Sequence, residues 1–173
     1  MIYINDNNLR NGIISNNEGN LSDETTLINE CTVKNFDVYF NIGVETGESN
    51  SSKNKGFGLL CSSYFGSRGA MNVIKDCTIH CDSLGESGGG IVGSHAGQEG
   101  VLIISGCTYI GKIMIIDEGD SQSSCGGIAG INLGQGGNVL VHNCITTGHI
   151  YNNFSGGICG KGVGLDGGKV VIS

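Results

Sequence analysis

The chain has 173 residues, 38% of them hydrophobic, so it is long and apolar enough to fold as one domain and is not a disordered polymer. Its 32 glycines, 6% aromatic residues and lack of tryptophan predict a narrow, regular core, and the lack of proline excludes collagen. A net charge of −7 with only nine Lys and Arg residues, well scattered, excludes a nucleic-acid partner.

Membrane and export signals are also missing from the sequence. No apolar stretch reaches the ~18–20 residues that span a bilayer. Residues 1–8 have no basic region followed by an apolar core, which a cleavable signal peptide requires. We therefore expect neither a membrane span nor a signal peptide.

A glycine-rich block is the first element that recurs along the chain. Its copies lie at 11–15, 56–60, 89–93, 126–130 and 156–160, and the first two are the weaker ones. Such a fixed recurrence is the sequence signature of repeat architectures. The later copies carry several glycines each, and glycine costs ~1 kcal/mol at a helix-interior position, so a helical repeat is disfavoured.

A second block, an apolar run that ends in a cysteine, follows each of the first four glycine blocks. Its copies lie at 27–32, 73–78, 103–108 and 140–145. The spacing from glycine to cysteine is the same from Gly12 to Cys31 and from Gly58 to Cys77. It is two residues shorter in the next two copies, which end at Cys107 and Cys144. This regularity indicates equivalent positions in successive repeats.

A third short block, clearest at 108–113 and 145–150, completes each repeat. Short apolar runs separated by glycine are typical of strands. We therefore predict an all-β fold, a right-handed parallel β-helix (solenoid) of four to five coils with three short strands per coil and ~4.8 Å between stacked strands. The predicted unit is a single domain over 1–173, with coils at roughly 11–55, 56–87, 88–124, 125–155 and an incomplete 156–173.

The later copies resemble a known repeat family. Segments 126–132, 136–139, 142–144, 147–150 and 156–160 follow one pattern: a Gly-Gly-aliphatic start, an Asn-Cys step, a Thr-Gly-x-aliphatic end and a return to Gly-Gly. This pattern is similar to the GLUG repeat over 88–160, with a weaker match before residue 80. The resemblance implies a β-solenoid scaffold of the kind found in large, surface-displayed, adhesin-like proteins, and it implies no catalytic residue.

The repeated cysteines predict a structural ladder that faces the core, made of Cys31, Cys77, Cys107 and Cys144. Disulfides between stacked rungs are a less favoured alternative, since regular parallel stacking does not give the required side-chain dihedral. A zinc site at Cys77, His80 and Cys81 is another, but a second ligand pair at suitable spacing is missing. We therefore expect no metal and no cofactor.

No catalytic set is predicted from the order of histidines, serines and carboxylates. One alternative remains open: Glu30 and Asp76 each precede a repeated cysteine, and stacked on one face they would resemble the carboxylate pair of a glycosidase. Two exposed carboxylates without a catalytic role are the favoured interpretation.

The acidic loops predict a binding edge. Repeat lengths vary most at 43–55, 82–87, 117–124 and 152–155, and insertions along one edge often mark the binding side of a solenoid. The candidate ligand- or partner-binding residues share this edge and a negative charge: Glu45, Glu48, Asp82, Glu86, Asp117, Glu118 and Asp120. A glycan or a protein surface rich in basic or hydroxyl groups would suit them.

The apolar residues of the middle strands suggest a partner. Residues 102–104 and 139–141 are apolar on both faces of the strand, and the last repeat stops before its cysteine. We expect a homo-oligomer, for example a trimer, or a part of a larger chain. The predicted function is a non-enzymatic structural or adhesive element of a surface, virion or envelope assembly. The alternative is a glycan-binding or glycan-cleaving β-helix protein.

Overall fold

The computed structural model describes residues 1–4, 12–14, 30–40, 56–68, 71–82, 84, 87–113, 124–151 and 155–173. In these residues the chain is all-β, with two parallel sheets of five strands each and no helix that could cross a membrane. The strands are β1 (Ile2–Ile4), β2 (Thr32–Lys34), β3 (Asp37–Phe40), β4 (Met71–Lys75), β5 (Thr78–Cys81), β6 (Val101–Ser105), β7 (Thr108–Ile110), β8 (Asn138–His142), β9 (Ile145–Thr147) and β10 (Lys169–Ile172).

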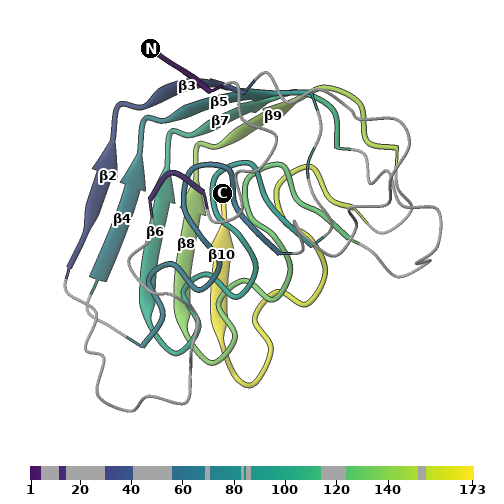
Figure 1. Ribbon diagram of the computed structural model, residues 1–173. Coiled ribbons are helices and arrows are strands. Elements are labelled where there is room, and N and C mark those ends of the chain that lie inside the picture. The colour runs from purple at the N-terminus through teal and green to yellow at the C-terminus, as the bar shows by residue number, and fades with distance from the viewer. Residues whose placement is uncertain are drawn as a thin grey trace.

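The strands alternate between two sheets as the chain advances. The odd-numbered strands form one sheet in the order β1-β3-β5-β7-β9, here called the odd sheet, and the even-numbered strands form the even sheet in the order β2-β4-β6-β8-β10. Every neighbouring pair is parallel. Figure 1 shows the even strands running side by side, with β2, β4, β6 and β8 each leading through a sharp bend into a strand of the odd sheet.

A third row of contacts lies between the end of each odd strand and the start of the next even strand. It consists of parallel single bridges rather than full strands. One column of these bridges joins Gly58, Gly89, Gly126 and Gly156, and another joins Ile14, Cys61, Val92, Ala129 and Cys159. The glycine-rich blocks that recur in the sequence thus stack directly on one another; we call this the glycine row.

The core lies between the even sheet, the odd sheet and the glycine row. In β4, β6 and β8 the second and fourth residues are buried while their neighbours are more exposed, as the two-residue period of a strand requires. One inward column of the even sheet is Val33, Ile74, Ile104 and Val141, each at most 3% exposed. Aliphatic side chains of similar size at equivalent positions therefore fill the core in each coil. We call each coil one rung of the stack.

Tyr109 is the largest fully buried side chain among the described residues, and it explains why position 90 of the glycine row is glycine. It follows Val38 and Ile79 in an inward column of the odd sheet. A Cβ added at Gly90 would clash with its ring and with the carbonyl oxygen of Gly127. The Tyr109 hydroxyl donates a hydrogen bond to the carbonyl of Cys81 (3.1 Å) or of Lys112 (3.0 Å), which satisfies the one polar atom of the ring.

A long turn leads from the glycine row back to the even sheet, and it repeats without having been predicted. Its copies span 62–68, 93–100, 130–137 and 160–168, and each contains several residues with positive φ. Each copy binds the next through the same backbone hydrogen bonds: Tyr64 N donates to Ser94 O (2.9 Å), and His95 N donates to Ile131 O (2.9 Å). The turns are therefore part of the stacked structure.

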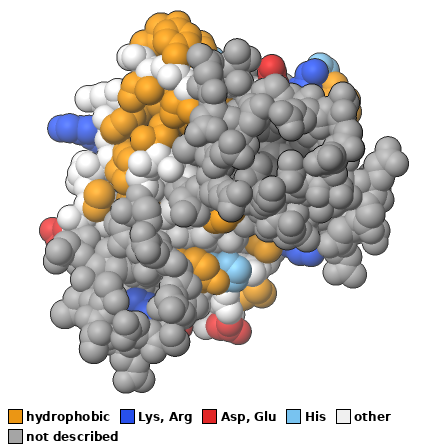
Figure 2. Space-filling model, in the orientation of Figure 1, with side chains coloured by type: hydrophobic (Ala, Val, Ile, Leu, Met, Phe, Trp, Pro, Cys, Tyr) orange, Lys and Arg blue, Asp and Glu red, His pale blue; other side chains and the backbone are white. Residues whose placement is uncertain are grey.

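One end of the stack leaves apolar side chains at the surface. β1 and β2 are the edge strands of their sheets at this end. Ile2 and Tyr3 are 40% and 68% exposed. Figure 2 shows hydrophobic side chains gathered in a patch where β2 and β3 lie.

Candidate functional site

The bend between the even and odd sheets is built from one left-handed residue per rung. Asn35, Asp76, Gly106 and Asn143 have φ values of 59°, 53°, 61° and 51°. Asn and Asp tolerate this conformation better than other L-residues, and glycine adopts it freely. A single residue with positive φ turns the chain sharply, so the side chain that follows points into the corner of the core.

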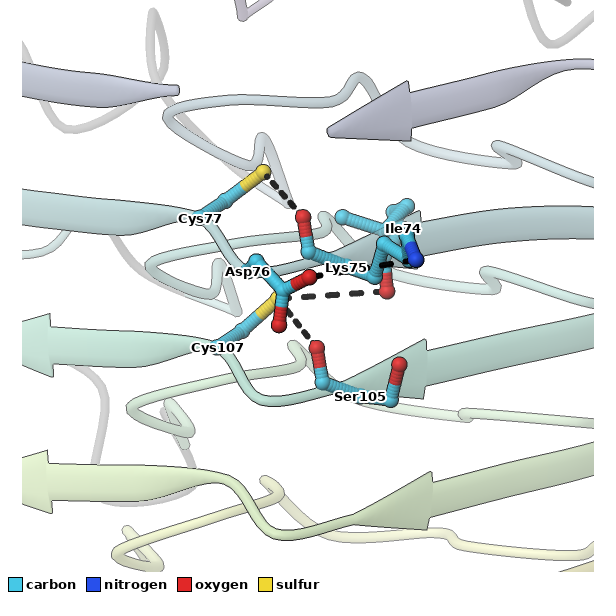
Figure 3. Close-up of polar contacts among 6 residues, drawn as sticks. All are labelled: Ile74, Lys75, Asp76, Cys77, Ser105 and Cys107. Atoms are coloured by element: carbon cyan, nitrogen blue, oxygen red, sulfur yellow. Dashed lines mark hydrogen bonds and ion pairs between the residues drawn. The ribbon is translucent and has the colours of Figure 1, made fainter. Parts of the chain in front are cut away.

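Three cysteines occupy this inward position on successive rungs. Cys77, Cys107 and Cys144 directly precede the paired strands β5, β7 and β9. Their thiols donate to the carbonyl oxygens two residues earlier, over 3.2 Å to Lys75, 3.4 Å to Ser105 and 3.4 Å to His142. Figure 3 shows the first two of these contacts in the same orientation on adjacent rungs. We call these three residues the thiol column.

The middle thiol of the column, Cys107, lies on the rung between Cys77 and Cys144 and influences the pKa of both. A hydrogen bond from Cys107 lowers the pKa of Cys77 and of Cys144 to about 7, because a donated hydrogen bond stabilises a thiolate. These same bonds, together with burial, raise the pKa of Cys107 far above its usual range. Since Cys107 has one proton, it stabilises one flanking thiolate at a time.

Exposure distinguishes the members of the thiol column. Cys77 and Cys107 are fully buried, whereas Cys144 is half-buried. Across the core from Cys144 lies Cys159, whose pKa is raised to about 12, mainly by burial and further by the nearby Cys144. All eight cysteines are in the reduced thiol form. Cys144 is therefore the member of the column that a reagent in solvent can reach.

The register excludes Cys31 from the ladder that the sequence predicted for it. β2 pairs with β4 so that Thr32 lies opposite Val73, which places Cys31 opposite Asn72. The backbone N–H of Cys31 donates to the Asn72 side chain over 3.1 Å. Phe36 takes the position before β3 that Cys77 takes before β5, and Thr78 N donates to Phe36 O over 2.7 Å. The predicted ladder was wrong at this rung, because equal spacing along the chain did not give equal positions in the stack.

The same register separates the two carboxylates of the glycosidase alternative. Continued back from Thr32, it places Glu30 opposite Met71, at the start of β4. Asp76 lies beyond the other end of β4, in the bend, and its carboxylate is 3.9 Å from the Lys75 ammonium (Figure 3). Glu30 and Asp76 therefore do not form a pair.

The acidic binding edge can be placed only at one residue. Asp82 follows β5 and is exposed. The other six candidates, Glu45, Glu48, Glu86, Asp117, Glu118 and Asp120, lie outside the described residues.

The zinc alternative is disfavoured because side chains along β5 point alternately into the core and outward. Cys81 faces the core and is 4% exposed, whereas His80 faces outward and stacks on Tyr39. In the part of the chain that the structure describes, no group of three His, Cys, Asp or Glu side chains is arranged to hold a metal ion.

The outer face of the odd sheet carries an aromatic column that the sequence did not reveal. Tyr3, Tyr39 and His80 are paired positions on β1, β3 and β5. Their rings stack with centroids 5.1 Å and 3.9 Å apart. His80 also lies 3.3 Å from the carboxylate of Asp37. The ring faces contact one another, so mainly the ring edges and the outer face of Tyr3 are left for a ligand.

The outer face of the even sheet carries an apolar column. Val73, Ile103, Leu140 and Val171 are paired positions on β4, β6, β8 and β10, and each alternates with inward-facing neighbours. Val171 is 56% exposed, and the other three are partly exposed. Met71 and Val101 add to this face at 47% and 37% exposure. We call this set the apolar face of the even sheet.

Comparison with known proteins adds no assignment. No protein-family model matches the chain, and no curated protein or solved structure is similar to it at a significant level. The resemblance to GLUG repeats therefore stays a prediction, supported by the residues quoted for it.

Proposed function

We propose that this chain is a non-enzymatic parallel β-solenoid, right-handed and GLUG-like, that serves as a structural or adhesive element of a larger surface assembly. Three features support the solenoid: the alternation of strands between two parallel sheets, the glycine row that closes each turn of the chain, and the repeated turn after it. Each described strand contacts only its neighbours in the same sheet, as expected of solenoid repeats.

The apolar face of the even sheet is the observation that supports assembly. A parallel sheet is ordinarily covered on both faces, and its strands are then apolar on both. Here one outward column begins at Thr32 and continues through four aliphatic residues, Val73, Ile103, Leu140 and Val171. The next outward column along the strands, Lys34, Lys75, Ser105 and His142, is polar, so the apolar area is a stripe within this face. We propose that a second copy of the chain covers this face, in a dimer or trimer.

The placement of the carboxylates argues for a scaffold over an enzyme. Glycosidases place two carboxyl groups opposite each other across the scissile bond, ~5–10 Å apart. The described candidates, Glu30 and Asp76, lie at opposite ends of β4. The repeated positions are instead occupied by residues that fit the close packing of the stack, such as glycine in the glycine row and cysteine in the thiol column.

The experiment is a measurement of mass in solution by light scattering on the purified full chain, over a hundredfold range of concentration. We expect a dimer or trimer, and we expect Leu140→Lys to shift it to monomer by placing a charge in the buried contact. Ile145→Lys is the matched control, since Ile145 is exposed at 56% on the odd sheet. A wild-type monomer throughout, or equal effects of the two variants, would overturn the assembly proposal.

Glycan binding is the second candidate, and the aromatic column of Tyr3, Tyr39 and His80 favours it. Aromatic rings and adjacent carboxylates such as Asp37 are suited to contact hydroxyl-rich ligands. A glycan array probed with the same protein separates this candidate from assembly alone. Saturable binding that is independent of oligomeric mass would favour the glycan-binding role.

A further inference from the structure

The thiol column combines three properties that structural cysteines seldom share. Cys107 and Cys144 belong to adjacent rungs, directly before β7 and β9, whose residues Thr108 and Ile145 are paired. The Cys144 Sγ also lies 3.7 Å from the carbonyl oxygen of Ile104, which belongs to the same rung as Cys107. Cys144 is half-buried, and Cys107 is fully buried behind it. A partly exposed thiol thus lies on the rung next to a buried one.

We propose that Cys144 and Cys107 form an oxidisable pair, in which a peroxide oxidises Cys144 and Cys107 then closes a disulfide that joins two adjacent rungs. This role is independent of the proposed assembly. It assigns Cys144 as the thiol that reacts first and Cys107 as the thiol that resolves the product.

The chemistry balances with hydrogen peroxide as the only oxidant. The Cys144 thiolate attacks one peroxide oxygen: an S–O bond forms, the O–O bond breaks, and the departing oxygen takes up protons and leaves as water. The sulfur is oxidised by two electrons to a sulfenic acid and the peroxide is reduced. The Cys107 sulfur, losing its proton, then attacks the sulfenic sulfur: the S–S bond forms, the S–O bond breaks, and a second water leaves.

The protonation states fit this order of events. Cys144 has a pKa of about 7, so roughly half of it is the reactive thiolate at neutral pH. Cys107 is held protonated by its raised pKa and stays unreactive until a sulfenic acid forms beside it. Cys159, the other thiol near Cys144, has a pKa of about 12 and is almost entirely protonated at neutral pH.

The backbone geometry permits the bond. Adjacent strands of a sheet are ~4.8 Å apart, within the ~4.4–6.8 Å between Cα atoms that disulfides span. Both cysteines lie in the bend after a left-handed residue, Gly106 or Asn143, and not within a regular strand. The thiols have only to rotate away from the Ser105 and His142 carbonyls that they contact now.

The test uses the full chain, reduced, freed of reductant and treated at pH 7 with stoichiometric hydrogen peroxide. Remaining thiols are alkylated, and peptides are mapped by mass spectrometry. We expect one peptide pair joined through Cys107 and Cys144, and in Cys107→Ser a Cys144 sulfenic acid that is trapped by a dione reagent. Cys125→Ser, a buried thiol outside the column, is the matched control and should still form the disulfide. A disulfide at other cysteines, or oxidation of Cys144 no sooner than Cys125, would overturn the proposal.

A second measurement needs no variant and therefore does not depend on the folding of Cys107→Ser. The rate at which iodoacetamide alkylates Cys144 in the native chain is followed against pH by peptide mapping. We expect a midpoint near pH 7, about 2 units below the value of 9.0 for an ordinary thiol. A midpoint at or above pH 9 would mean that the column does not activate Cys144 and would overturn the proposal.

Discussion

Replacing Tyr109 by Phe tests whether the buried core is organised as described. The ring, which is fully buried, stays, so no cavity forms and the packing against Gly90 is unchanged. Only the hydroxyl is lost, and the carbonyls of Cys81 and Lys112 lose the donor that now reaches them at 3.1 and 3.0 Å. A buried acceptor left without its partner costs ~1–3 kcal/mol, so we expect a loss of about 1.5 kcal/mol in the free energy of unfolding.

Urea unfolding followed by circular dichroism measures this loss. For a chain of this length each kcal/mol corresponds to ~2–4 °C, so the melting temperature should fall by about 3–6 °C while the urea m-value is unchanged. Tyr151→Phe is the control, because Tyr151 is 58% exposed and its hydroxyl can be hydrated in both states. Equal midpoints for the two variants would refute the buried hydrogen bond and with it the placement of Tyr109 in the core.

Two further predictions concern the glycine row and alkaline pH. Gly90→Ala should lower the free energy of unfolding by at least about 2 kcal/mol, because its Cβ would clash with Tyr109. Gly157→Ala is the control: its Cβ would meet only the Ile150 side chain at 3.9 Å, so the free energy of unfolding should change by less than about 1 kcal/mol. Equal losses in urea unfolding would contradict the packing. Burial raises the pKa of Cys159 from 9.0 to about 12 and raises that of Tyr109 above 10.0. The unfolded chain therefore releases these two protons first, so the stability that they contribute is lost as the pH rises through 9 and above. The lowered pKa of Cys77 and Cys144 acts in the opposite direction, and only between about pH 7 and 9. No fall in urea unfolding between pH 9 and 11 would contradict the burial of Cys159 and Tyr109.

The even strands were the most predictable part of the fold, for a physical reason. Their apolar runs at 73–78, 103–108 and 140–145 recur with a glycine block before each, and in the structure these runs pair as neighbours. The rung at Cys31 was misplaced because the sequence records spacing along the chain and not the register of hydrogen bonds. Phe36, with no likeness to cysteine, fills the equivalent corner at the end of the stack.

The repeated turn and the aromatic column could not be predicted. The turn copies at 93–100 and 130–137 share glycines, one glutamine (Gln98 and Gln135) and their left-handed positions, which a search for apolar runs does not detect. Tyr39 and His80 become neighbours only when β3 and β5 are in register. Columns of outward side chains are a product of register, whereas columns of inward side chains leave a hydrophobic pattern in the sequence.

The backbone bonds between successive turns restrict how a chain of this design can change in length. Tyr64 N–H meets Ser94 O, and His95 N–H meets Ile131 O, so every rung presents the same donors above and acceptors below. Removal of one whole rung would bring Tyr64 to Ile131 with donor and acceptor still matched. Removal of half a rung would leave them facing the wrong groups. In the turns, where these bonds repeat from coil to coil, the chain can therefore change in length only by whole coils, whereas the loops elsewhere differ in length among the coils.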